Sequence, residues 1–183
     1  MSDQLLIREL QNGNTRAFHE LVNTYQQLVY NTVLSMVQQA AEAEDIAQEV
    51  FIQVFRSIGK FRGDSQLGTW IYRIAVRKAI DWERRKKLRS RIQVLVSWLG
   101  VQDTAAAQET FYHPGIVLEQ KERAAQLFKA MKALPEKQRI CFVLIRVEGL
   151  SYAQAAEVME LSVKAVESLM QRAKENLRKL LES

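Results

Sequence analysis

Apolar residues recur every three or four positions along most of this chain, and few residues interrupt that spacing. One long run extends from Phe18 to Met36, and a second extends from Ala43 to Ile58. Such spacing gathers the apolar side chains on one face of a helix, which must then be buried against other elements. The 183 residues include only seven Gly and two Pro, so the chain has few obligatory breaks. We therefore expect an all-α fold.

Capping residues and breaks divide this pattern into separate helices. Gly13 and Gly59 are placed to end helices, and Pro135 suits the first position of one that closes at Gly149. The apolar positions that we expect to be buried include Leu5, Phe55 and Leu180. We expect helices at residues 2–11, from 15 to about 36, 43–58, from 70 onward, 117–131, 135–149 and 152–160, and a final helix centred on Met170.

The most basic segment, residues 60–91, contains eleven Lys or Arg and three acids. On a helix, Arg73, Arg77 and Arg84 fall within about 40° of one another, which forms a stripe suited to a phosphate backbone. Aromatic residues lie among these charges and offer faces on which unpaired bases stack. A solvated basic helix is the alternative interpretation. Trp70 is expected in the core, whereas the places of Tyr72 and Trp82 stay open.

The segment before it is acidic, with seven acids and three bases in residues 1–59. Opposite charges in neighbouring segments favour two binding surfaces of different preference. The helix at 43–58 carries an acidic and polar ridge on the edge away from its apolar face, with one apolar residue in its middle. Its members are Asp45, Gln48, Glu49, Ile52 and Arg56. A solvated surface is the alternative interpretation of this ridge.

The last third of the chain predicts a helix-turn-helix. Ser151 and Gln154 form a capping box at the start of a short helix, Leu161 and Ser162 form a tight turn, and a longer basic helix follows. In such motifs the second helix enters the major groove of DNA. Its side chains turned away from the core include amide, basic and acidic groups that read base edges. A plain helical hairpin is the alternative interpretation.

Taken together, four segments in this order resemble a bacterial sigma factor of the extracytoplasmic-function (ECF) group in the sigma-70 family. They read EDIAQEVFIQVFRSIGKF, GTWIYRIAVRKAIDWERRKK, ALPEKQR and GLSYAQAAEVMELSVKAVESLMQRAKENL. The resemblance implies two small helical domains joined by a flexible linker. These are a region 2 bundle at residues 1–91, an interdomain linker at 92–117, and a region 4 helix-turn-helix domain at 118–183.

The resemblance also implies a function: binding core RNA polymerase and directing promoter-specific initiation of transcription. By resemblance, the ridge of Asp45, Gln48, Glu49, Ile52 and Arg56 docks on the clamp coiled coil of the beta-prime subunit, and the beta subunit is a further contact. The minus-ten element, read as duplex and single strand, contacts Arg62, Gly63, Asp64, Ser65, Tyr72, Arg73, Arg77 and Arg84. The minus-thirty-five element contacts Lys164, Glu167, Ser168, Gln171, Arg172 and Lys174.

The resemblance also implies that an anti-sigma protein is an optional partner of this chain. This chain departs from relatives at Arg77, Asp81, Glu167 and Leu169, which lie near DNA by resemblance, so the promoter sequence does not carry over. No cofactor, metal or catalytic residue is implied. The expected location is the cytoplasm, in association with the nucleoid.

Other classes of protein fit the residues less well. A one-component or response-type regulator would bind an operator without polymerase. An enzyme is disfavoured because the two histidines, His19 and His113, lie on a core helix and in the linker, and no metal-ligand spacing or phosphate loop occurs. The single cysteine, Cys141, lies in an apolar run and is expected to be buried and unreactive. No apolar run is long enough to cross a membrane, and no export signal is expected.

Overall fold

The computed structural model describes residues 3–98 and 121–182, and every regular element in these two ranges is helical. The elements of the first range are α1 (Asp3–Gln11), α2 (Thr15–Val37), α3 (Ala40–Ser57), the short 3₁₀ turn η1 (Ile58–Lys60) and α4 (Leu67–Trp98). Those of the second are α5 (Lys121–Ala133), α6 (Glu136–Phe142), the π-helical turn η3 (Val143–Val147), α7 (Tyr152–Met159) and α8 (Val163–Glu182). The all-α prediction is confirmed.

Local sequence signals account for the boundaries of the first helices. Gly13 adopts a φ of +77°, which a residue with a side chain rarely accepts, and α1 ends just before it. The side chain of Asn14 then caps α2 by accepting hydrogen bonds from the amides of Arg16 and Ala17. α2 ends at Gln38, which takes the left-handed conformation with a φ of 57°. These caps set the sharp turns that let α1, α2 and α3 pack side by side.

The longest helix, α4, begins at Leu67 and runs through Trp98. It therefore starts three residues before the expected position 70, and both Leu67 and Thr69 are buried. At its other end it continues past residue 91, the predicted end of the first domain. The remainder of the predicted linker, residues 99–117, lies outside the described residues. The predicted domain boundaries accordingly stay predictions.

Helix α7 begins at its predicted cap, whereas Pro135 is the N-cap of α6 and not its first residue, and α6 gives way to the π-helical turn η3 after Phe142. The Ser151 hydroxyl accepts from the amide of Gln154 at 3.2 Å, and the Gln154 side chain accepts from the amide of Ser151 at 2.9 Å, so the capping box is present. Glu160, in the left-handed conformation with a φ of 56°, makes the turn between α7 and α8. The helix-turn-helix is confirmed as a short helix, a tight turn and a long helix.

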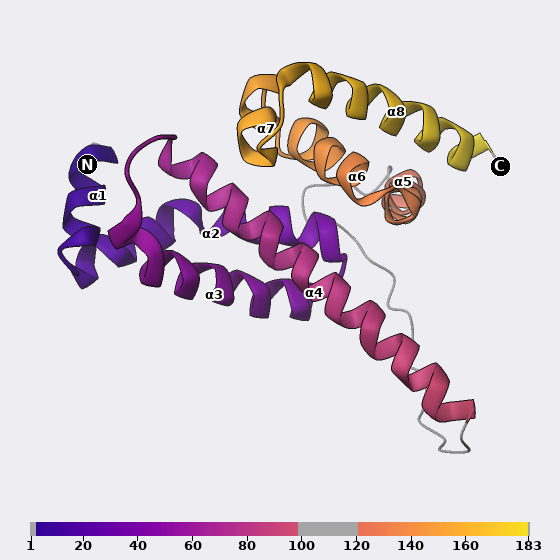
Figure 1. Ribbon diagram of the computed structural model, residues 1–183, viewed down its shortest axis with the longest axis horizontal. Coiled ribbons are helices and arrows are strands. Elements are labelled where there is room, and N and C mark those ends of the chain that lie inside the picture. Colours follow the sequence, from indigo (N-terminus) through magenta and orange to yellow (C-terminus); the bar gives the residue numbers. More distant parts are fainter. Residues whose placement is uncertain (1–2, 99–120, 183) are drawn as a thin grey trace.

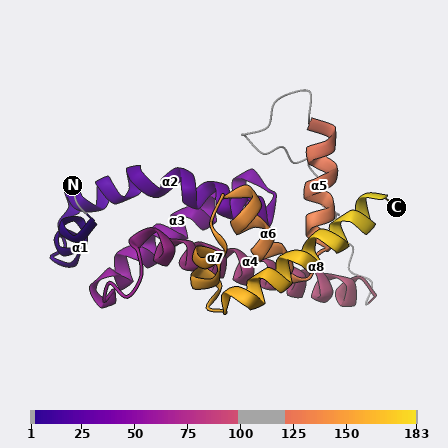
Figure 2. The ribbon, with the colours of Figure 1, turned by 90° about the horizontal axis from the view of Figure 1, so that it is seen from above.

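Two groups of helices pack against each other as layers. Figure 1 shows α1–α4 in one layer and α5–α8 in the other, with the last part of α4 projecting away from both. Figure 2, from above, shows α6 and α7 lying over the bundle of α2 and α4. α2 packs against α3, α4 and η3, while α4 also packs against α7. One hydrophobic cluster runs through both layers, from Leu6 in α1 to Leu177 in α8.

Cys141 lies in this cluster, as predicted. Its side chain is fully buried, and its Sγ lies 3.5 Å from the carbonyl oxygen of Val166. Burial raises the pKa of this thiol to about 11. The thiolate, which is the reactive form, is therefore scarce at neutral pH.

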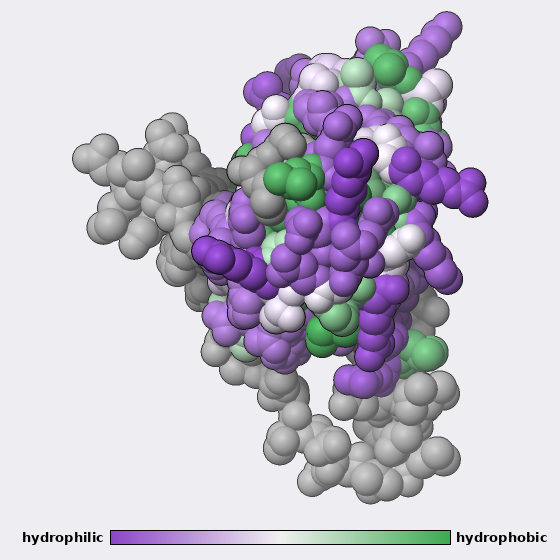
Figure 3. Space-filling view, turned by 90° about the vertical axis from the view of Figure 1, so that its left-hand side faces the viewer, coloured by the Kyte–Doolittle hydropathy of each residue, from purple (hydrophilic) through white to green (hydrophobic). Residues whose placement is uncertain are grey.

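Three apolar positions expected in the core are exposed instead. Leu5 is 48% exposed, Phe55 54% and Leu180 41%. Leu5 and Phe55 lie at the rim of the apolar face of their helices, whereas Leu180 lies in the last turn of α8. The end of the molecule near α1, seen in Figure 3, is mainly hydrophilic with separate hydrophobic patches. Spacing alone therefore overestimated the width of the buried stripes.

Candidate functional site

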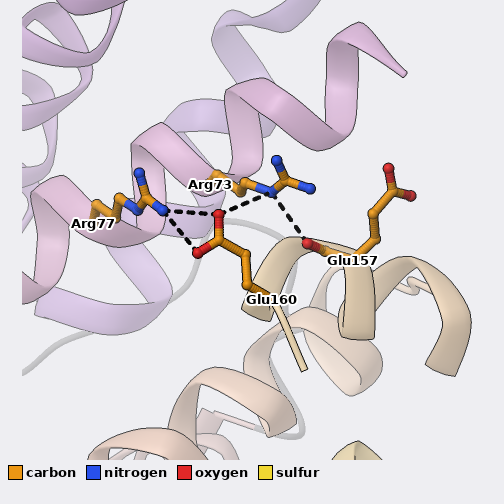
Figure 4. A network of polar contacts seen from close by, with 4 residues as sticks. All are labelled: Arg73, Arg77, Glu157 and Glu160. Atoms are coloured by element: carbon orange, nitrogen blue, oxygen red, sulfur yellow. Dashed lines mark hydrogen bonds and ion pairs between the residues drawn. The ribbon is translucent and has the colours of Figure 1, made fainter. Parts of the chain in front are cut away.

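The predicted arginine stripe exists on α4, and it faces the carboxyl-terminal helices. The Nε of Arg73 donates to the carbonyl oxygen of Glu157 at 3.1 Å and lies 3.9 Å from the Glu160 carboxylate. Arg77 donates to both carboxylate oxygens of Glu160, at 2.9 and 3.0 Å. Figure 4 shows the two guanidinium groups converging on the end of α7. The predicted stripe therefore exists, and groups of the same chain pair with its guanidinium groups.

The stripe continues toward the far end of α4 with a second acidic partner. Arg84 donates to the Glu136 carboxylate at 3.0 Å. Glu136 lies in the first turn of α6, where its negative charge also suits the positive end of the helix dipole. All three predicted arginines therefore lie on one face of α4, as the 100° spacing requires.

A buried ion pair lies beside this stripe. Glu83 of α4 accepts a hydrogen bond from Nη2 of Arg139 in α6, and the two side chains are only 12% and 5% exposed. The remaining Nε of Arg139 is buried, and no partner for it occurs in the described part of the chain. A buried charge is costly unless it is paired, so Arg139 depends on Glu83. The sequence did not single out either residue.

Tyr72 and Trp82, which the sequence assigned neither to the core nor to a DNA surface, are both half-buried. The Tyr72 hydroxyl donates to the Glu148 carboxylate at 3.5 Å, and burial, with Glu148 second, raises the pKa of Tyr72. The indole of Trp82 donates to Glu42 at 2.7 Å, and the ammonium of Lys86 lies 4.7 Å from its ring centre.

The loop before α4 is the other part of the predicted minus-ten surface. Arg62, Gly63 and Asp64 are exposed and Ser65 is partly so. Gly63 has a φ of +78°, so a residue with a side chain would be strained there. Trp70 is half-buried and packs against Phe61, with ring centres 5.0 Å apart, in agreement with its predicted place beside the core.

The predicted polar ridge of α3 lies on an accessible edge of the bundle. Asp45, Gln48 and Arg56 are exposed, and Ile52 is 50% exposed. Glu49 is partly covered and accepts from Lys78 of α4 at 3.2 Å. A ridge of polar groups around an exposed apolar side chain is typical of an anchor for another protein.

The structure adds neighbours that the sequence pattern missed. Phe55 lies one turn along from Ile52 and meets the ring of Phe18 edge-on, with centres 5.1 Å apart. A shallow groove between α2 and α3 adjoins the ridge, and it is lined by Val22, Gln26, Gln27, Tyr30, Glu44, Ala47, Gln48 and Phe51. Only the packing of two helices brings these α2 residues beside the ridge.

The outward face of α8 is open along its first half. Val166, Met170 and Ala173 are buried against the preceding helices, which turns the predicted base-reading side chains outward. Each of those side chains is exposed: Lys164, Glu167, Ser168, Gln171, Arg172 and Lys174. Gln171 also donates to Glu175 at 3.2 Å, along the same helix. The face is free to enter a groove.

Two other kinds of feature were sought in the described ranges. No group of three or more His, Cys, Asp or Glu side chains is arranged there to hold a metal ion. In the same ranges, no helix is both long and apolar enough to cross a membrane.

Both parts of the chain match known protein families. The sigma-70 region 2 family matches residues 21–89, and the sigma-70 region 4 family matches residues 124–177. The chain belongs to the sigma-70 family of RNA polymerase sigma factors, in its ECF group. The RNA polymerase sigma-H factor of Pseudomonas aeruginosa is 35% identical, with 98% of this chain and 94% of that protein covered. The ECF RNA polymerase sigma-E factor of Escherichia coli is 32% identical, with 96% and 92% covered.

Solved structures share the fold. CnrH, in complex with the cytosolic domain of CnrY, matches with a TM-score of 0.70 at 23% identity, covering 100% of this chain and 98% of that one. The sigma factor RpoE of Bartonella quintana, in complex with the anti-sigma factor NepR, matches with a TM-score of 0.62 at 22% identity, covering 90% and 96%. The helical order described above is therefore an established arrangement.

Proposed function

We propose that this chain is the subunit that binds core RNA polymerase and directs transcription from a specific set of promoters. The observation that carries the proposal is the presence of both sigma-70 regions in one chain, in order, in a protein aligned over nearly its whole length with other sigma factors. The subunit acts by binding and positioning, without catalysis of its own. RNA polymerase works where the chromosome lies, so we place the protein in the cytoplasm at the nucleoid.

We assign the minus-ten element to the loop at 62–65 and to α4. The exposed loop, with its glycine in the left-handed conformation, suits a site for a base turned out of the duplex. Arg73, Arg77 and Arg84 supply a row of positive charge at helical spacing for the separated strand. Tyr72 lies beside the same row. Ion pairing with phosphates would replace the pairing with glutamates seen here.

We assign the minus-thirty-five element to the outward face of α8. A helix of this kind reads the major groove with side chains near its amino-terminal end. Gln171 is suited to adenine and Arg172 to guanine, whereas Lys164 and Lys174 suit phosphates. Glu167 and Ser168 complete the face. The exposure of all six side chains is what supports this assignment.

We assign the core polymerase interface to the ridge of α3. Exposed Ile52, with Phe55 beside it, provides an apolar anchor, and Asp45, Gln48 and Arg56 provide a polar rim. The expected partner is the clamp coiled coil of the beta-prime subunit, with the beta subunit as a further contact. An anti-sigma protein is a further expected partner, of the kind that the sigma factor RpoE of Bartonella quintana has in its solved complex with NepR.

Reconstitution with core polymerase tests this function. The purified chain is added to bacterial core RNA polymerase with fragmented genomic DNA from its own source, and transcript starts are mapped. We expect starts that core polymerase alone does not produce, preceded by a shared pair of sequence elements. The rival function, an operator-binding regulator, predicts specific DNA binding with no new starts. That result would overturn the proposal.

A further inference from the structure

A pocket of about 450 Å³ lies where the end of α2, the second half of α4, α5 and α6 meet. Its volume falls in the range of small-molecule binding sites. The arginine stripe, the ridge of α3 and the base-reading face of α8 contribute no residue to it. It is lined by Val37, Trp82, Glu83, Lys86, Lys87, Ser90, Lys132 and Arg139.

The lining of this pocket is strongly basic. Four of the lining residues are Lys or Arg, and Glu83 is the one acid among them. The Glu83 carboxylate already accepts from Arg139, and Lys86 donates to a neutral acceptor, the Gln39 side chain, at 2.7 Å. Within residues 3–98 and 121–182, no carboxylate forms an ion pair with any of the three lysines. The pocket therefore holds an excess of positive charge.

The electrostatics of Lys132 show that these cations affect one another. Loss of solvation lowers the pKa of Lys132, and the positive charge of Lys86 lowers it further. The charge of Arg139 acts in the same direction, and only Glu83 opposes it. A bound anion with several negative charges would favour the charged form of Lys132 and offset the repulsion between the ammonium groups.

The pocket has a buried floor and an exposed rim. Val37 and Arg139 are buried, whereas the three lysines are exposed. The Arg139 side chain is 5% exposed, and its Nε has no partner in the described part of the chain. Trp82 lies between floor and rim, with its indole held by Glu42 at 2.7 Å. A buried donor without a partner is costly, so the floor favours a ligand with acceptor oxygens.

The position of the pocket favours a small anion over the backbone of a nucleic acid. Its walls come from both layers of helices, and the buried floor lies below the rim of lysines. A duplex would contact the exposed rim only, whereas a compact anion fills the volume. Linked phosphate groups carry several charges close together and accept charge-assisted hydrogen bonds from ammonium and guanidinium groups.

We propose that this pocket binds a small molecule that carries two or more linked phosphate groups, with Lys86, Lys87 and Lys132 pairing with the phosphates above Arg139. Two sources share this chemistry, an inorganic phosphate chain and the phosphate chain of a nucleotide. The base of a nucleotide would have Trp82 as its neighbour. The inference concerns the free chain and does not depend on the proposed function.

Two lysines of the rim can be neutralised without breaking an ion pair. Lys87→Gln combined with Lys132→Gln removes one charge from each layer of helices. The matched control is Lys60→Gln combined with Lys179→Gln, which also removes one exposed charge from each layer, away from the pocket. Both double variants have the same net charge. Circular dichroism checks that both are folded.

Binding is measured by isothermal titration calorimetry with sodium tripolyphosphate in a magnesium-free buffer. We expect the wild type and the Lys60/Lys179 control to bind alike and the Lys87/Lys132 variant to bind about tenfold more weakly, because two charge-assisted contacts are lost. Equal binding by all three proteins would overturn the inference. Absence of saturable binding by the wild type would also overturn it, as would sulfate binding as tightly as tripolyphosphate at the same ionic strength.

Further titrations separate the sources of the phosphate chain. Adenosine triphosphate binding more tightly than tripolyphosphate would identify a nucleotide, and equal or weaker binding would identify an inorganic chain. A mixed-sequence DNA duplex should bind the two double variants alike. If the Lys87/Lys132 variant lost affinity equally for tripolyphosphate and for the duplex, these lysines would belong to a general DNA-backbone surface, and the inference would be overturned. Absence of new transcript starts with tripolyphosphate binding intact would remove the proposed function only.

Discussion

Arg139 of α6 and Glu83 of α4 form the most buried ion pair in the described part of the molecule. Their side chains are 5% and 12% exposed, whereas Arg77 and Glu160 at the neighbouring pair are 65% and 56% exposed. Exposed pairs contribute about 0.2–1 kcal/mol, whereas breaking a buried pair costs several times more. Among the ion pairs that join the two layers, we therefore expect the pair of Arg139 and Glu83 to be the most costly to break.

Replacing Glu83 with Gln should destabilise the chain. The variant leaves the guanidinium of Arg139 buried without a counter-charge, at a cost of about 3 kcal/mol in the free energy of unfolding. Urea unfolding followed by circular dichroism measures this loss in the free energy of unfolding. Adding Arg139→Met should recover part of the loss, because no buried charge is then left over. A Glu83→Gln variant as stable as Glu182→Gln would show that the pair contributes nothing.

Charge reversal on the α3 ridge should weaken binding to core polymerase. Asp45→Lys is the cleaner change, since Asp45 is exposed, whereas reversal at Glu49 also removes its pairing with Lys78. We expect the affinity for core to fall by at least about 1 kcal/mol, with duplex DNA binding unchanged. Co-purification with core checks this result. Glu175→Lys, on α8, serves as the control, and retention of core by the Asp45 variant would refute the assignment.

Arg172→Ala should weaken recognition of the minus-thirty-five element. A side chain that reads a base edge contributes roughly 1–3 kcal/mol of discrimination. The comparison is between a promoter fragment found in the reconstitution experiment and the same fragment with that element scrambled. Arg178→Ala, in the second half of α8, is the control, because Arg178 is exposed and pairs with Glu182 at 2.8 Å. Unchanged discrimination by the Arg172 variant would reject its role in reading bases.

The pH dependence of the free energy of unfolding should show the effect of the raised pKa of Glu148. Burial raises the pKa of its carboxyl to about 7, while hydrogen bonds with Thr32 of α2 and Tyr72 of α4 act in the opposite direction. Because the pKa of Glu148 is higher in the folded state than in the unfolded state, its protonated form favours folding. Its contribution to the free energy of unfolding is therefore complete below about pH 4.5 and is lost as the pH rises through about 7. Unfolding free energies of the wild type and Glu148→Gln, measured across this range, should differ in slope. If the unfolding free energies of the two proteins changed with pH in parallel, the pKa of Glu148 would not be raised in the folded state.

Spacing along the chain was enough to predict the all-α class, the capping box at Ser151 and the outward face of α8. Those features depend on residues near one another in sequence, where helix geometry leaves little freedom. The same local argument placed Arg73, Arg77 and Arg84 on one face of α4. It failed for Phe55, because the width of a buried stripe is set by the partner that packs on it, and for Leu180, which lies in the last turn of α8.

The sequence by itself determined the helices, their polar faces and the family to which the chain belongs, because these follow from local periodicity and motif order. Only the tertiary structure decided what lies opposite those faces. The pairing of Glu83 with Arg139 joins positions far apart in the chain, and so does that of Arg77 with Glu160. No periodicity encodes which acid meets which base across an interface. The packing of two apolar surfaces selects those partners, and it turned the predicted DNA surface of α4 toward the chain itself.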